Sequence, residues 1–200
     1  MNATLNRICT AVSLFFIGSC IVVAESIEVR ELEYSLIKYE SSDEWYELSI
    51  ELEAFRDSQD EERRDPSFID NIRVEVFVAT EIRATGRKKP FEFYRSGVEL
   101  VSIEQGRTFV RFYLPPEIVK RDRVRGEPHS FIVRVYRGEE LLNQSLSRSL
   151  NRESVLANFE KRLAENIAAN DGILLPQKGT PFFNEYSGAS TTGKGAPFSN

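Results

Sequence analysis

The sequence contains few of the residues that carry covalent or metal chemistry: two cysteines, one histidine, one methionine and one tryptophan in 200 residues. Both cysteines, Cys9 and Cys20, lie within the first 24 residues. The remainder therefore has neither a disulfide nor a thiol nucleophile, and its stability must come from burial, as a domain above about 100 residues can manage. A zinc site would lack its usual several histidine or cysteine ligands. We expect no metal and no cofactor.

His129 is the single histidine, so a Ser-His-Asp triad would have to use it as the base. It follows Gly126-Glu127-Pro128 at the expected start of a strand, and no serine lies in a nucleophile-elbow pattern. We interpret His129 as a loop residue at a strand edge, and no catalytic residue is predicted.

Residues 1–24 have the order of a secretory signal: a polar start with one basic residue, Arg7, an apolar run, and then small residues. The run is shorter than a membrane-spanning helix requires and is interrupted by polar residues, although an uncleaved anchor is an alternative. Two processing routes stay open. Cleavage after Ala24 would release a chain beginning at Glu25, whereas Ile17-Gly18-Ser19-Cys20 matches a lipobox and would leave an acylated Cys20.

This segment predicts an exported protein, periplasmic or extracellular, attached to a membrane only if Cys20 is lipidated. Without it the chain keeps 25 of its 26 basic residues against 31 acidic ones, a net charge of −6. An acidic protein has no general electrostatic attraction to nucleic acid or to anionic lipid. The basic clusters at 87–89 and 120–125 are expected to be solvated loops.

Apolar and polar residues alternate with period two through most of residues 27–146, which is the pattern of half-buried strands. Strands are expected at 27–39, 46–54, 72–78, 91–94, 98–103, 108–114, 131–135 and 141–146. In the first of these the apolar parity shifts, which predicts a bulge near Arg30 or Glu31. Residues 115–129 are expected to form a long, proline-bounded loop.

Seven or eight short strands without long helical crossovers predict a mainly β fold of two packed antiparallel sheets. An immunoglobulin-like β-sandwich is the first interpretation, and a small barrel is the second. After residue 150, Leu156, Phe159, Leu163 and Ile167 recur at helical spacing, so an amphipathic helix is expected, with Ser149 or Asn151 as its cap and Gly172 at its end. The helix would cover its own sandwich or dock onto a partner.

The predicted organisation is a signal peptide at 1–24, a β-sandwich domain at 25–150, a helix at 151–172, an extended docking segment at 173–186 and a disordered tail at 187–200. The tail is small and polar, too poor in apolar groups to offset its chain entropy. Within the docking segment, Pro181, Phe182, Phe183 and Tyr186 are the candidate partner-binding residues. The alternative is that the phenylalanines pack on their own domain.

Glu47, Glu51 and Glu53 share one face of a predicted strand and are the only carboxylate row that could serve a hydrolase. Alternation alone predicts such a row on a solvated outer face, and we favour that interpretation. Aromatic residues on an outer face would instead support a carbohydrate-binding or adhesive module.

The secretory start, a β-sandwich without cysteines, the amphipathic helix and the Thr180-Pro181-Phe182 step followed by Tyr186 together resemble the immunoglobulin-like extracytoplasmic proteins of bacterial type IV pilus gene clusters. The resemblance covers residues 25 to about 186. It implies a non-enzymatic part of a pilus or secretion assembly that contacts another envelope protein. No catalytic residues come with it, and the oligomeric state stays open.

Overall fold

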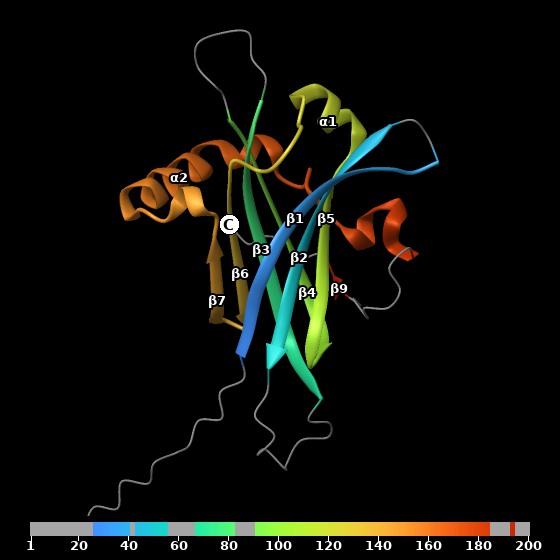
Figure 1. Ribbon diagram of the computed structural model, residues 1–200, viewed down its shortest axis with the longest axis vertical. Helices are drawn as coiled ribbons and strands as arrows, with labels where there is room; N and C mark the ends of the chain where they lie inside the picture. Colours follow the sequence, from blue (N-terminus) through green and yellow to red (C-terminus); the bar gives the residue numbers. More distant parts are fainter. Residues whose placement is uncertain (1–25, 41–42, 56–66, 83–90, 185–192, 195–200) are drawn as a thin grey trace, which may run out of the picture.

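The computed structural model describes residues 26–40, 43–55, 67–82, 91–184 and 193–194, which form two antiparallel sheets (Figure 1). The first sheet has the order β1 (Ser26–Lys38), β2 (Glu44–Phe55), β5 (Gly106–Leu114) and β8 (Leu175–Pro176). The second has the order β7 (Glu140–Leu146), β6 (Ser130–Arg137), β3 (Phe68–Glu81), β4 (Phe91–Glu104) and β9 (Gly193–Lys194). The predicted mainly β chain of two antiparallel sheets is confirmed. The barrel alternative is wrong, because hydrogen bonding divides these strands into two sheets.

The core lies between the two sheets and is built from the alternate residues that the periodicity selected. Tyr46, Leu48 and Ile50 of β2 are buried, and they share one cluster with Val74 and Val76 of β3 from the opposite sheet. Burying apolar surface is the main favourable term in folding, so this shared cluster holds the sheets face to face.

The predicted bulge in the first strand is confirmed, since the pairing of β1 with β2 shifts register between Val29 and Glu31. The two strands predicted at 91–94 and 98–103 are one strand, β4. Ser96 and Gly97 continue its pairing with β3 opposite Val76 and Glu75. These two small residues looked like a break in the apolar pattern, but both are buried within the sheet.

The segment 115–129 contains a short helix, α1 (Pro116–Asp122), where a loop was expected. Pro116 occupies the first turn, a position that proline tolerates because the missing N–H has no helical partner there. The helix ends at Arg123, whose φ of 52° lies in the left-handed region. The sequence did not predict this helix because it lacks an apolar periodicity. Apart from Pro116, Val119 is the one buried apolar residue among its seven residues.

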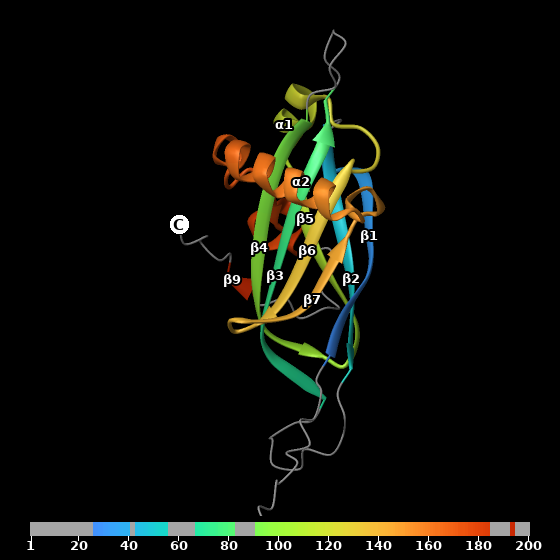
Figure 2. The ribbon, with the colours of Figure 1, turned by 90° about the vertical axis from the view of Figure 1, so that its left-hand side faces the viewer.

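The expected amphipathic helix is present as α2 (Glu153–Asn166), continued by a 3-10 turn, η2 (Ile167–Asn170). It lies across the outer face of the second sheet (Figure 2). Phe159 packs there against Phe93, with ring centroids 5.7 Å apart. The helix thus covers its own domain. The predicted caps are wrong: Arg152 is the N-cap residue and no side chain caps the helix, while Ser149 belongs to the preceding 3-10 turn η1 (Arg148–Leu150).

The C-terminal segment is not simply extended, as was expected for residues 173–186. Only β8 is a strand, and it is followed by two 3-10 turns, η3 (Gln177–Gly179) and η4 (Pro181–Asn184). Turns form here because the backbone amide and the hydroxyl of Thr180 both donate to the Gln177 carbonyl, a local bond that replaces pairing with a strand. We call residues 171–184 the strap. Figure 1 shows its turns beside β5.

The tail predicted to be disordered lies outside the described residues except at Gly193–Lys194. These two residues form β9 and pair with Leu100 and Glu99 of β4, and the expectation of disorder for the tail as a whole stays a prediction. The signal segment and Cys20 also lie outside the described residues. Across the ranges that the structure does describe, no helix is both long enough and apolar enough to cross a membrane.

Candidate functional site

The sequence-predicted partner residues are divided between the interior and the surface. Phe182 is only 1% exposed. Its ring stacks on Tyr113 of β5 and meets Trp45 of β2 edge to face, at centroid distances of 4.8 and 5.5 Å. The alternative that the phenylalanines pack on their own domain therefore holds for Phe182, whereas Phe183 is 51% exposed.

Local hydrogen bonds direct Phe182 toward the sheet. The Thr180 hydroxyl donates to the Gln177 carbonyl at 2.8 Å and accepts from the Phe182 amide at 3.3 Å. The Gln177 side-chain amide donates to the Phe182 carbonyl at 3.0 Å. Pro181 is exposed, and Tyr186 lies outside the described residues. The partner-binding role of the four candidates, Pro181, Phe182, Phe183 and Tyr186, stays a prediction.

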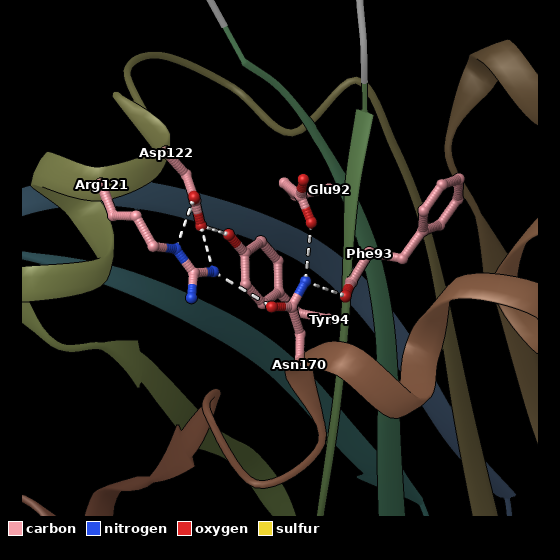
Figure 3. A network of polar contacts seen from close by, with 6 residues as sticks. All are labelled: Glu92, Phe93, Tyr94, Arg121, Asp122 and Asn170. Carbon is pink, nitrogen blue, oxygen red and sulfur yellow. Dashed lines mark hydrogen bonds and ion pairs between the residues drawn. The ribbon is translucent and has the colours of Figure 1, made fainter.

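A polar network joins α1, β4 and η2 (Figure 3). Arg121 donates to both carboxylate oxygens of Asp122 at 2.7 Å and to the side-chain oxygen of Asn170 at 3.0 Å. The Asn170 amide donates in turn to the Phe93 carbonyl at 3.1 Å and to the Glu92 carboxylate at 2.9 Å. Tyr94 completes the network by donating its hydroxyl to Asp122. These bonds anchor Asn170, the last residue of η2 before the strap, to β4.

The network stabilises the neutral phenol and the guanidinium cation. Burial, followed by the hydrogen bond to Asp122, raises the pKa of Tyr94 well above its ordinary value. The hydrogen bond to Asp122 likewise raises the pKa of Arg121. A tyrosine held neutral beside a paired carboxylate is a structural donor, so we assign this network to positioning.

The carboxylate row of Glu47, Glu51 and Glu53 is less exposed than a solvated outer face would be. The interpretation of this row as a solvated face therefore needs correction. Glu47 is buried and accepts a hydrogen bond from the Ser35 hydroxyl at 3.5 Å. Glu51 pairs with Arg107 at 3.3 Å. Glu53 pairs with Arg30, the residue at the bulge, which also pairs with Glu28 at 2.9 Å. Cross-strand pairing places Glu28 directly opposite Glu53, so the bulge arginine offsets a repulsion between like charges.

His129 is within hydrogen-bonding distance of a serine hydroxyl that contacts a second serine hydroxyl. Its Nδ1 lies 2.8 Å from the Ser130 hydroxyl, which lies 2.9 Å from the Ser149 hydroxyl. Its ring packs against Phe91, with centroids 4.5 Å apart. Within the described ranges, no group of three or more histidine, cysteine or acidic residues is placed to hold a metal ion.

A surface that the sequence did not predict lies along the edge of β1 that faces away from β2. Leu32, Tyr34 and Leu36 pair opposite the buried residues Ile50, Leu48 and Tyr46, so they face the space between the sheets. The second sheet does not cover them fully: Tyr34 is 36% and Leu36 is 39% exposed. Alternation predicted which face these residues share, but it could not predict that Tyr34 and Leu36 stay partly exposed there.

A pocket of about 400 Å³ lies beside this edge, and we call it the edge pocket. Tyr46 supports two of its neighbours: its hydroxyl donates to the carbonyl of Gly126, the residue before Glu127, at 2.9 Å, and its ring stacks on Tyr34 with centroids 5.7 Å apart. Burial raises the pKa of Tyr46, which keeps this donor protonated. Apolar and acidic groups from β1, the 127–128 segment and β6 line the pocket: Leu32, Tyr34, Pro128, Phe131, Glu31, Glu33 and Glu127.

The described residues thus form a two-sheet β domain with a helix across one sheet and an acidic, partly apolar pocket at one strand edge. No family model matches the sequence, and no curated protein matches it. A solved crystal structure of a protein from Akkermansia muciniphila is similar in fold. It is 16% identical in sequence with a TM-score of 0.62, and the match covers 88% of this chain and 96% of that one. At this identity the similarity concerns the fold alone.

Proposed function

We propose that this protein is an exported, non-enzymatic binding or scaffolding protein of the bacterial cell envelope, acting in a type IV pilus or secretion assembly. Its mechanism is strand addition: an extended segment of a partner protein pairs with the free edge of β1. The observation that carries the proposal is that Tyr34 and Leu36 face the interior of the fold and yet stay exposed.

The backbone of β1 supports this mechanism. Among the described strands, β1 hydrogen-bonds only to β2. Half of the backbone groups of an edge strand point away from its partner and are available to a further strand. An added strand would also cover Tyr34 and Leu36, and burying an apolar side chain contributes about 1.5–3 kcal/mol.

The edge pocket indicates the chemistry of the partner segment. Side chains alternate along a strand, so every second side chain of an added strand would point toward Leu32, Tyr34 and Phe131. Glu31, Glu33 and Glu127 surround these apolar groups. The complementary segment is therefore extended, places an apolar side chain in the pocket and carries lysine or arginine beside it.

Two further observations support the location and the fold type. Residues 1–24 have the pattern of a secretory signal. The first three strands of one sheet follow the order β1-β2-β5, and the other sheet has the order β7-β6-β3-β4 before the short β9. This division resembles that of an immunoglobulin-like sandwich and supports that interpretation. One strand differs: β4 pairs with β3, whereas the constant-type arrangement places the fourth strand beside the fifth.

The proposal is tested with short, fluorescently labelled synthetic peptides. Their binding to the full mature chain is measured by fluorescence anisotropy. A peptide alternating leucine with lysine is expected to bind more tightly than its leucine-glutamate counterpart by at least about tenfold. Methylating the backbone nitrogens of the first peptide should abolish binding, since strand addition needs those donors. Binding that survives methylation would exclude the mechanism.

Matched variants then locate the binding edge. Glu31→Lys with Glu33→Lys should reverse the preference between the two peptides, and Leu36→Glu should weaken both. Leu141→Glu is the control, because Leu141 is an exposed apolar residue on β7, the edge strand of the other sheet. Equal effects at Leu36 and Leu141 would contradict the assignment to β1. In the producing cell, a photo-crosslinker at position 36, but not at 141, should capture an envelope protein through an extended basic segment.

A further inference from the structure

A second pocket of about 400 Å³ lies between α2 and the outer face of the second sheet, and we call it the helix pocket. Its apolar lining includes the rings of Phe91 and Phe93 from β4 and Phe159 from α2. Its volume falls within the range of about 300–1,000 Å³ that is usual for small-molecule sites. It is on the outside of the second sheet, so it is separate from the edge pocket of the first.

Arg162 is the charged group of the helix pocket. Its guanidinium lies over the faces of Phe91 and Phe93, 5.6 and 5.7 Å from their centroids. Within the described part of the chain, no hydrogen bond or ion pair engages this guanidinium. Stacking on two rings holds the planar donor group in one orientation and leaves its N–H groups available.

Two other arginines on the same face of the second sheet differ from Arg162. Arg134 also lies over a ring, that of Phe77, but it donates to Glu160 at 2.7 Å and to Gln144 at 2.9 Å. Arg95 forms two bonds to Asp171 at 2.9 and 3.2 Å. A neighbouring carboxylate thus accepts hydrogen bonds from Arg134 and from Arg95. Among the described residues, Arg162 has no such carboxylate partner and lies over aromatic rings that line the helix pocket.

Further donors accompany Arg162 around the helix pocket. Ser154, Asn158 and Arg162 follow one another at intervals of four on α2, so they lie on one side of the helix, and all three line the pocket. His129 lines it from below, with Nδ1 held by Ser130 and its other ring nitrogen without a hydrogen bond among the described residues.

We propose that the helix pocket binds an organic acid with an aromatic or apolar body. The body lies against Phe91, Phe93 and Phe159, and the carboxylate receives two parallel N–H bonds from Arg162. A planar guanidinium matches a carboxylate in this two-bond geometry, and such charge-assisted bonds are about twice as strong as neutral ones. This inference goes beyond the proposed function, because peptide binding at β1 does not depend on it.

The single histidine makes the test direct. The imidazole of His129 gives the only histidine signals in an NMR spectrum of the chain. Titration with 2-naphthoate should shift these signals and saturate with a Kd below about 1 mM. The neutral 2-naphthamide has the same ring system without the charge and should bind at least about tenfold more weakly.

Two variants separate the pocket from general surface charge. Arg162→Gln should weaken naphthoate at least about tenfold, and Val155→Trp should block it, because Val155 lines the pocket from α2. Lys161→Gln removes a positive charge from the adjacent helix position, which is outside the pocket lining, and should leave the Kd unchanged. Thermal melts check that each variant folds, and leucine-lysine peptide binding should be unaffected in all three.

Three results would overturn the inference: no shift of His129 up to about 10 mM naphthoate, equal affinity for the acid and its amide, or equal affinity in Arg162→Gln and the unmodified chain. A failure here with normal peptide binding would leave the proposed function intact. If the peptide tests failed while naphthoate bound normally, the proposed function would be contradicted and the inference about the helix pocket would stand.

Discussion

The ring of Phe182 lies parallel to that of Tyr113, with an interplanar angle of 16° and centroids 4.8 Å apart. This contact closes the strap onto the outer face of the first sheet. Before it, Asn170 and Asp171 bind to β4 of the second sheet, and β8 pairs with β5 of the first. The strap therefore links the two sheets on the side opposite the β1 edge.

Replacing Phe182 by alanine should lower the free energy of unfolding by about 3–5 kcal/mol, since a buried ring is lost and its cavity is only partly refilled. Urea denaturation measures the change. The fluorescence of Trp45, the single tryptophan, should also change, because its ring meets that of Phe182. Phe183→Ala is the control and should alter stability by less than about 0.5 kcal/mol. Equal costs at the two positions would contradict the observed packing.

Phe159→Ala should loosen α2 without unfolding the sheets. Phe159 is the buried residue of the helix and contacts Phe93, so its removal should cost about 3 kcal/mol or more. Hydrogen exchange should accelerate in residues 153–166 before it accelerates in β3. Glu165→Gln, an exposed change in the last turn, provides the comparison. Uniform acceleration across the sheets would show that the helix and sandwich unfold as one unit.

Alkaline pH should destabilise the protein partly through Tyr94. Its pKa is raised in the folded state by burial and by Asp122, so the stabilisation is complete below the unfolded pKa near 10 and is lost as pH rises toward the folded value. Urea unfolding from pH 8 upward should show a steeper loss for the unmodified chain than for Tyr94→Phe. Identical slopes would mean that Tyr94 ionises freely in the folded state.

Acid should weaken the contact between Arg95 and Asp171. The hydrogen bonds from Arg95 hold the pKa of Asp171 below its usual value. Its contribution is therefore present above the unfolded pKa near 3.9 and disappears as pH falls through the lower, folded value. Asp171→Asn should cost at most about 1 kcal/mol at pH 7, because the Asp171 side chain is 47% exposed and solvent screens the pair. Below both pKa values of Asp171 the substitution should cost nothing. High salt should reduce the cost, and a cost that persists at pH 2 would contradict the ion-pair explanation.

Period-two alternation was sufficient where a strand has one buried and one more exposed face, as β2 does over most of its length. It located Tyr46, Leu48 and Ile50 in the core, and the parity shift located the bulge at Arg30. It failed at Ser96 and Gly97, where small residues continue β4. It also failed at α1, a helix with one turn of apolar packing, because propensity and periodicity are weak over seven residues.

The candidate sites were less predictable than the strands. Phe182 and Phe183 are adjacent and identical in type, yet one is buried and the other exposed. The hydrogen bonds of Thr180 and Gln177 decide between them, and these bonds require the chain to turn at a place where an extended segment was expected. Arg162 carried no signal, since an arginine on the polar side of an amphipathic helix is ordinary in sequence.

The sequence by itself determined the signal-like start, the β-rich class, the facing of alternate residues and the amphipathic helix, because these depend on the period of the backbone and on local composition. Tertiary structure decided which faces are covered. Tyr34 and Leu36 stay partly exposed although they are on the core-facing side of β1, and Phe182 is buried because the strap returns to β5. Burial depends on segments distant in sequence, so no local pattern could determine it.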